Sequence, residues 1–215
     1  MARTLQTNPR KYATQSRSRA TVDALIEATA RILVREGFDQ ASTNRIAEQA
    51  GVSIGSLYQY FPGKDALVAA VIDRHREELG EVVRTALAKA ANQSLEQAVR
   101  TLVIAAMDAH AIDPKLHRVL AEQIPRTGRL EKVETFSREN YALFTAFLKR
   151  HSDELRVDDL ELASFMLVTT VEALTHSAVL HRPAMLRDAA AMNRLVGETT
   201  RLLVGYLRQA GGRRQ

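Results

Sequence analysis

The chain has 215 residues, of which 46% are hydrophobic and 26% charged, and it contains no cysteine. This composition excludes a disordered or collagen-like chain, and the lack of cysteine excludes disulfides and thiolate metal sites. The net charge is +5. All of this excess lies in residues 1–20, which carry five basic side chains and no acid: Arg3, Arg10, Lys11, Arg17 and Arg19. A basic arm ahead of a folded domain indicates a polyanion partner, and a solvated arm without a partner is the alternative.

No segment of the sequence is expected to span a membrane. The most apolar stretch, residues 160–180, is interrupted by Glu161, Glu172 and His176, whereas a spanning helix needs roughly 18 or more apolar residues. The N-terminus is polar and basic, unlike a secretory signal. We therefore expect a cytoplasmic protein without a membrane partner.

Hydrophobic side chains recur with helical spacing along almost the whole chain. The first helix is expected from about Ser18 to Gly37. A helix of roughly 40 Å is expected from Lys64 to about residue 91. Further helices are expected over 94–111 after the capping box of Ser94 and Gln97, from Asp113-Pro114 to before Pro125, over 128–150, from Asp158 to His181, and from Pro183 to about Gln209.

The fold class is therefore predicted to be all-α, with about nine helices and no strand. We expect a flexible basic arm over residues 1–17, a three-helix N-terminal domain over 18–63, and a C-terminal helical bundle over 64–210.

Residues 42–61 have the pattern of a helix-turn-helix. Thr43 is predicted to cap a short helix, and Gly51 supplies the left-handed residue that ends it. Ser53 is predicted to cap a second short helix with Leu57 and Phe61 on its inner face. The outward positions of this second helix are small or uncharged: Gly55, Ser56, Gln59 and Tyr60. Such a helix can enter a DNA major groove.

Three residues of this segment, and Lys64 after it, allow both a functional and a structural interpretation. A glycine inside a helix lowers its stability by about 1 kcal/mol relative to alanine. Close approach of DNA or a tight contact with the first helix would explain why glycine occurs at position 55. Tyr58 and Tyr60 are either half-buried core aromatics or hydroxyl donors to phosphate. Lys64, at the start of the long helix, is either a phosphate contact or an ordinary surface lysine.

Together these residues resemble the TetR/AcrR family of transcriptional regulators. The resemblance covers about 50 residues from Ser18 onward and shows no departure at the signature positions, which are Thr43, Ile46, Ala47, Ala50, Gly51, Val52, Ser53, Gly55, Leu57, Tyr58, Tyr60, Phe61, Lys64 and Leu67. It implies a bacterial cytoplasmic homodimer, usually a repressor, with a ligand-responsive bundle and a dimer surface on the last two helices. It implies phosphate contacts at Thr43, Tyr58, Tyr60 and Lys64. It also implies base-edge contacts at Asn44 or Arg45 and at Ser53, Ile54, Gly55 and Ser56.

Two further sets of residues are predicted in the bundle. An apolar ligand pocket needs aromatic and methionine side chains with a few isolated hydrogen-bonding groups, which are offered by Met107, His110, Tyr141, Phe144, Phe165 and Thr169. A solid core is the alternative. A two-fold four-helix dimer interface is predicted at Ala173, Ser177, Ala178, Leu195, Leu202, Leu203 and Tyr206. Burial within one subunit is the alternative.

Metal binding and catalysis are not indicated. Glu172 and His176 are four residues apart on one helix, and His110 and His117 flank an Asp-Pro break, but two ligands without a fixed third are a weak signal. No paired carboxylates, phosphate-binding glycine loop or catalytic triad spacing is found, so we expect no metal, cofactor or enzyme activity.

The sequence therefore predicts a homodimeric repressor that binds a palindromic double-stranded DNA operator and is released by a small hydrophobic ligand. A DNA-binding regulator without an effector and a helical protein–protein adaptor with a basic arm are the alternatives.

Overall fold

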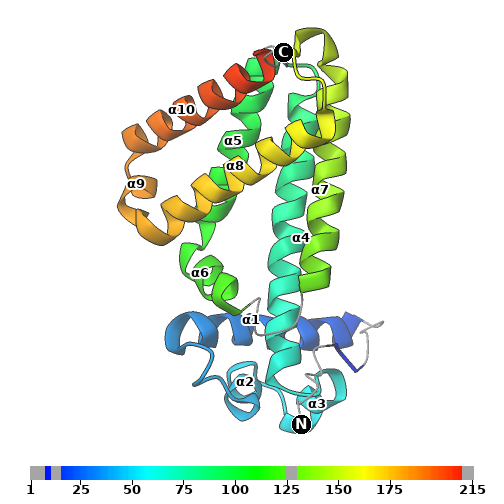
Figure 1. Ribbon diagram of the computed structural model, residues 1–215. Coiled ribbons are helices and arrows are strands. Elements are labelled where there is room, and N and C mark those ends of the chain that lie inside the picture. The colour runs from blue at the N-terminus through cyan, green and yellow to red at the C-terminus, as the bar shows by residue number, and fades with distance from the viewer. Residues whose placement is uncertain (1–7, 11–15, 124–129, 210–215) are drawn as a thin grey trace, which may run out of the picture. The chain divides into compact units, whose positions relative to one another are not determined.

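The computed structural model describes residues 8–10, 16–123 and 130–209, and within them the secondary structure is helical without strands (Figure 1). The all-α prediction is confirmed. The described residues form ten α-helices and one short 3-10 helix, against about nine helices expected. They are α1 (Ser16–Glu36), α2 (Thr43–Gln49), α3 (Ile54–Tyr60), α4 (Lys64–Ala90), α5 (Leu95–Ile112), α6 (Pro114–Gln123), α7 (Leu130–Arg150), η2 (Ser152–Glu154), α8 (Leu160–His181), α9 (Pro183–Arg187) and α10 (Ala189–Arg208).

The chain divides into two compact units. The first unit comprises residues 1–77 and 115–132, and the second comprises residues 78–114 and 133–215. The first half of α4 and most of α6 therefore belong with α1, α2 and α3. This division does not coincide with the boundary between residues 63 and 64 that the sequence suggested.

The core of the first unit holds the two short helices in place. Ile46 of α2 and Leu57 of α3 are fully buried together with Leu25, Leu33 and Leu67 of α1 and α4. Complete burial of such a side chain contributes about 1.5–3 kcal/mol. Because helices of seven residues are unstable alone in water, α2 and α3 depend on this burial.

In the second unit, α8 and α10 both pack against α5 (Figure 1). Leu95, Val99 and Met107 of α5 are buried in this core with Leu148 of α7 and Leu207 of α10. The helix α5 therefore packs against, and buries, the inner faces of both α8 and α10.

By length and composition, one helix among the described residues is long and apolar enough to cross a membrane. It is α8, over Leu160–Val179, and 39% of this segment is buried. The core helix of a soluble protein passes the same test, so the expectation that no segment spans a membrane stays a prediction. The helix is apolar on two faces, since it packs on α5 and also exposes Leu162, Phe165 and Met166.

One of the two helix N-caps considered next is the predicted residue, and the other is its neighbour in the sequence. Ser94 caps α5 as predicted, since its side chain accepts from the backbone N–H of Gln97. The cap of α8 is Asp159 and not Asp158, because Oδ1 of Asp159 accepts from the N–H groups of Glu161 and Leu162 at 3.0 and 2.9 Å.

The prediction of a single helix from Pro183 to Gln209 is wrong, since this segment forms the two helices α9 and α10. The carboxylate of Asp188 accepts from the backbone N–H groups of Ala190 and Ala191 at 2.9 and 3.2 Å, which ends α9 and begins α10. An aspartate can bond to the nearby backbone in this way and so interrupts a helical pattern.

The adjacent aspartates before α8 provide a direct test of this capping. Asp159→Ala should lower the free energy of unfolding by about 0.5–2 kcal/mol because two helix N–H groups lose their acceptor. Asp158→Ala should change it by less than about 0.5 kcal/mol. Chemical denaturation of both variants measures the difference, and equal effects would contradict the assignment.

Candidate nucleic-acid interface

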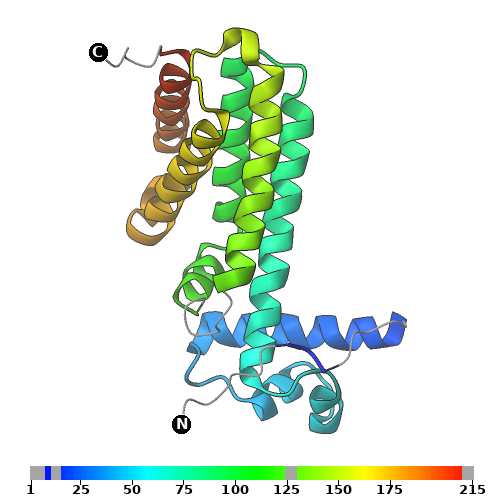
Figure 2. The ribbon, with the colours of Figure 1, turned by 45° about the vertical axis from the view of Figure 1, so that its right-hand side comes forward.

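The segment from Ser42 to Phe61 forms two short helices, α2 and α3, joined by a tight turn (Figure 2). Gly51 has the left-handed φ of +67° that the turn requires, and Val52 donates to the carbonyl of Ala47 at 3.0 Å. Ser53 caps α3 by accepting from the N–H of Ser56 at 3.1 Å. The cap of α2 is Ser42 and not Thr43. The helix-turn-helix prediction is confirmed.

Most of the predicted DNA-contacting side chains are accessible. The exposed residues are Asn44, Arg45, Ser53, Ile54, Gly55 and Tyr58. Thr43, Ser56 and Lys64 are partly exposed. The helix α3 has no charged side chain along its whole length, so nothing on it repels a polyanion.

Hydroxyl groups from the two helices meet at this surface. Oγ1 of Thr43 lies 3.1 Å from Oη of Tyr58, and Tyr58 is 41% exposed. Hydroxyls can donate as well as accept, so the pair can present donors to a phosphate oxygen.

Tyr60 is not part of this surface. Its side chain is only 8% exposed and belongs to the core of the first unit, so the prediction that it faces outward is wrong. The positions of Leu57, Tyr60 and Phe61 follow i, i+3, i+4 spacing, which places all three on the inner face of α3.

The structure excludes the packing explanation for Gly55. A Cβ built on Gly55 would meet only Oγ of Ser53, at an ordinary contact distance of 3.8 Å. The residue is exposed, and its φ is not positive. Nothing in the part of the first unit that the structure describes therefore requires glycine here.

Lys64 connects the start of α4 to the loop after α1. Its Nζ donates to the carbonyl of Phe38 at 2.9 Å and lies 4.1 Å from the centroid of the Phe38 ring. An ammonium has three donors, so this contact is compatible with an additional phosphate contact. It also gives Lys64 a structural role that the sequence did not reveal.

Two residues at this surface were not predicted as individual contacts. Arg10 donates its backbone N–H to the carbonyl of Tyr60 at 2.7 Å, and its Nη1 lies 3.4 Å from the carbonyl of Tyr58. Glu36, the last residue of α1, forms an ion pair with Arg45. Most of the arm predicted to be flexible, residues 1–17, lies outside the described residues.

The residues predicted to line an effector pocket all lie in the second unit, on α5, α7 and α8. Met107 is fully buried and Phe144 packs against the same core. The ring of Tyr141 lies 5.8 Å from that of Phe165, which is 46% exposed. Thr169 is partly exposed.

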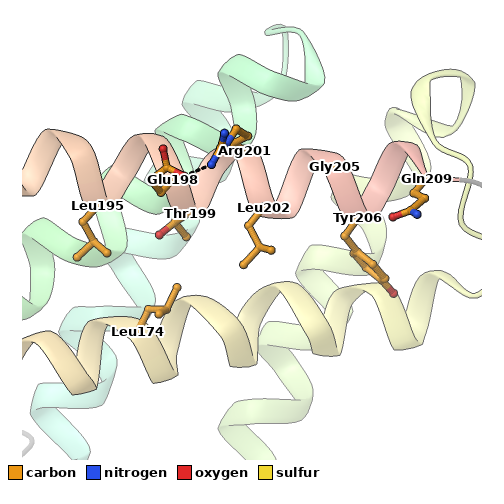
Figure 3. A pocket seen from close by; sticks show the side chains of 9 residues that line it. All are labelled: Leu174, Leu195, Glu198, Thr199, Arg201, Leu202, Gly205, Tyr206 and Gln209. Atoms are coloured by element: carbon orange, nitrogen blue, oxygen red, sulfur yellow. Dashed lines mark hydrogen bonds and ion pairs between the residues drawn. The ribbon is translucent and has the colours of Figure 1, made fainter.

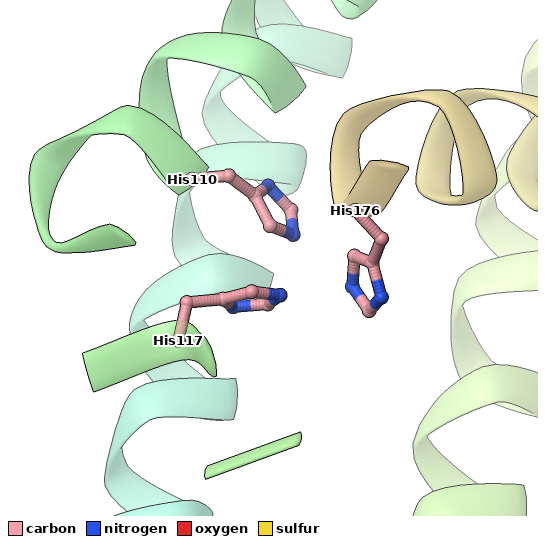
Figure 4. A group of neighbouring side chains, drawn as sticks. All are labelled: His110, His117 and His176. Carbon is pink, nitrogen blue, oxygen red and sulfur yellow. The ribbon is translucent and has the colours of Figure 1, made fainter. Parts of the chain in front are cut away.

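Two histidines meet between α5 and α8. The ring centroids of His110 and His176 are 5.5 Å apart (Figure 4), and His117, drawn there as well, belongs to the first unit. Nδ1 of His110 donates to the carbonyl of Ala106 at 2.7 Å. Burial lowers the pKa of His176, which favours its uncharged form. These rings therefore add polar atoms to an otherwise apolar region.

A groove of about 620 Å³ separates α8 from α10. Figure 3 shows Leu195, Leu202 and Tyr206 directed from α10 toward α8, with Leu174 on the opposite side. Leu202 is 58% exposed. Of the residues predicted for a dimer interface, Ala173 and Ser177 are exposed, Leu195 and Tyr206 are partly exposed, and Ala178 and Leu203 are buried inside the unit.

Two parts of the chain match known families. Residues 25–71 match the family described as "Bacterial regulatory proteins, tetR family", and residues 94–207 match that described as "Tetracyclin repressor-like, C-terminal domain". The chain therefore belongs to the TetR family of bacterial transcriptional regulators.

A curated relative is the HTH-type transcriptional activator FasR of Mycolicibacterium smegmatis, with 35% identity over 98 residues, which cover 46% of this chain and 44% of FasR. The chain thus aligns with less than half the length of this relative. The fold is shared with the fatty acid degradation regulator FadR of Bacillus halodurans (TM-score 0.67, 22% identity, 93% of this chain and 100% of that chain). It is also shared with FadR of Bacillus subtilis in complex with stearoyl-CoA (TM-score 0.64, 18% identity, 86% and 98%).

Proposed function

We propose that the protein is a homodimeric repressor that binds a palindromic DNA operator in the cytoplasm and is released by a small, largely hydrophobic effector. The observation that carries this proposal is the exposed surface of α2 and α3. It combines the paired hydroxyls of Thr43 and Tyr58, the guanidinium of Arg45 and an uncharged α3 with an unobstructed glycine. Hydroxyl and guanidinium donors suit phosphates and base edges.

Gly55 gives this surface its closest point of approach. Glycine inside a helix is less stable than alanine, and the open space around Gly55 would accommodate a methyl group. Because glycine at position 55 lowers helix stability and no neighbour in the described chain requires it, we infer that a partner outside the chain does. We infer that the DNA backbone or a base edge approaches α3 at this residue.

Gly55→Ala should therefore raise the free energy of unfolding by about 0.5–1 kcal/mol while it weakens operator binding. Operator DNA is first identified by sequencing the fragments that the protein binds in cells. Affinity is then measured by fluorescence anisotropy, and stability by chemical denaturation. Gly197→Ala is the matched control, because it also fills open space on a helix but lies in α10. Unchanged affinity of Gly55→Ala would contradict the proposed contact, and a wild-type protein that selects no DNA would refute the function.

A second copy of the chain is the proposed partner of the α8–α10 surface. The lining of the groove is mainly apolar, although Glu198 and Arg201 also contribute to it. Large hydrophobic side chains are exposed on the two helices at Leu162, Met166 and Leu202. Such exposed apolar surface marks an interaction site, and members of the TetR family act as dimers. Ala178 and Leu203 are left out of the proposed interface because they are buried within the unit. Two-fold symmetry of the dimer would match a palindromic operator.

Leu202→Glu should produce monomers that bind the palindromic operator weakly, because a carboxylate would be buried against the partner subunit. Light scattering measures the oligomeric state, and anisotropy measures the affinity. Leu143→Glu is the control, since Leu143 is an equally large exposed side chain that lies on α7. If Leu202→Glu remains dimeric, the dimer interface does not include Leu202 and lies elsewhere.

The proposed effector site lies among α5, α7 and α8. Its predicted lining includes Met107, the Tyr141–Phe165 ring pair and the imidazole of His110, and the ring of His176 lies beside that of His110. This mixture of apolar surface and a few polar atoms suits a hydrophobic ligand with one or two polar groups. The stearoyl-CoA complex of a protein with the same fold supports an acyl-type effector.

Phe144→Ala should alter the response to effector while operator binding without effector persists. Because Phe144 is partly exposed, the variant should lose only about 1–2 kcal/mol of stability, whereas Phe147→Ala, which empties a site that is 3% exposed, should lose about 3–5 kcal/mol. Thermal shift against apolar small molecules, including acyl-CoA esters, identifies the effector. Equal losses of stability in the two variants would favour a solid core.

A further inference from the structure

Glu36 and Arg45 form an ion pair between the last residue of α1 and the first turn of α2. Each stands at the helix end where its charge is disfavoured, since helix C-termini carry partial negative charge and N-termini partial positive charge. A pair that served stability alone would be better placed with the two charges exchanged. The arrangement therefore points to a requirement for arginine at position 45.

The contact leaves much of Arg45 accessible. Its side chain is 50% exposed, whereas that of Glu36 is 21% exposed. The carboxylate engages Nη1, and the backbone N–H of Arg45 is held by Oγ of Ser42 at 3.4 Å. A guanidinium has five donors in a planar fork, so a carboxylate on one edge fixes the orientation of the other edge.

Arg45 also lies in the same helical turn as Thr43, whose hydroxyl meets that of Tyr58. An arginine edge can donate two hydrogen bonds to O6 and N7 of guanine. Since both bonds require a defined plane and direction, an arginine whose orientation is fixed beforehand discriminates better between bases than a mobile one.

We propose that Glu36 is a positioning residue that sets sequence preference: it orients the guanidinium of Arg45 to read one base pair in each half of the operator. This inference rests on the proposed DNA-binding function. It assigns Glu36 no contact with DNA, and its carboxylate lowers the affinity for DNA in general because it is an anion.

The experiment compares wild type, Glu36→Gln, Arg45→Ala and the double variant. The operator is selected from a random duplex pool by the wild-type protein. Affinities are then measured for that operator, for duplexes with each base pair replaced symmetrically in both halves, and for a scrambled duplex. Glu81→Gln is the matched control, because it removes one carboxylate from an exposed ion pair with Arg84 in the second unit.

Glu36→Gln should reduce discrimination by roughly 5- to 100-fold at the single base pair where Arg45→Ala also reduces it. Affinity for the scrambled duplex should stay equal or increase. In the Arg45→Ala background the Glu36 substitution should have no further effect at that base pair, and Glu81→Gln should resemble wild type.

Three results would overturn the proposal. The first is that Glu36→Gln loses affinity equally for all duplexes and has a lowered melting temperature. The second is that it gains affinity for all duplexes with unchanged discrimination. The third is that it loses discrimination at a base pair that Arg45→Ala does not affect. Failure of the wild-type protein to select any sequence from the pool would instead refute the DNA-binding function, so the two failures are distinguishable.

Discussion

The burial of the inner faces of α2 and α3 in the core of the first unit holds the whole candidate interface together. Each helix has two turns, too few to persist alone in water. Ile46 and Leu57 have no exposed surface, and Phe61 is 1% exposed. Side chains on the inner face of the motif therefore fix the direction of those on its outer face, so a cavity in this core would disturb Thr43, Arg45 and Gly55 together.

Local stability is lower than it could be at Gly55 and Arg45, which are assigned to DNA, and at Glu36, which is assigned to position Arg45. Gly55 lowers helix propensity in a place where alanine would fit, and Glu36 and Arg45 each oppose the dipole of their helix. Elsewhere in the described chain, the residues follow the locally stable pattern, since Ser94 and Asp159 cap the helices that follow them. Departures from the locally most stable choice tend to gather at functional sites. Their grouping around α2 and α3 is independent of any family resemblance.

Patterns within one helix or one turn were sufficient to predict most of the fold. Gly37 and Gly51 have the positive φ expected of residues that end helices. Tyr60 was misplaced although its i, i+3 spacing from Leu57 indicated the inner face. The helix break at Asp188 was not predicted, because the helical pattern of hydrophobic residues continues through this capping residue. The Glu36–Arg45 pair is of another kind, since its partners lie in different helices separated by a loop and no periodicity relates them.

The helices α8 and α10 show why periodicity cannot separate a core from an interface. Both pack on α5 with one face and leave further apolar side chains on the other, so α8 reaches the composition of a membrane-spanning helix. The apolar side chains of α8 lie on more than one face and give no preferred direction. The helix α10 is amphipathic, but the sequence alone assigned its adjacent residues Leu202 and Leu203 to the same surface. Adjacent residues point about 100° apart on a helix, and the structure buries Leu203 at 3% exposure while Leu202 remains 58% exposed. Burial within a single chain thus separates the residues that stabilise the subunit from those left to bind a partner.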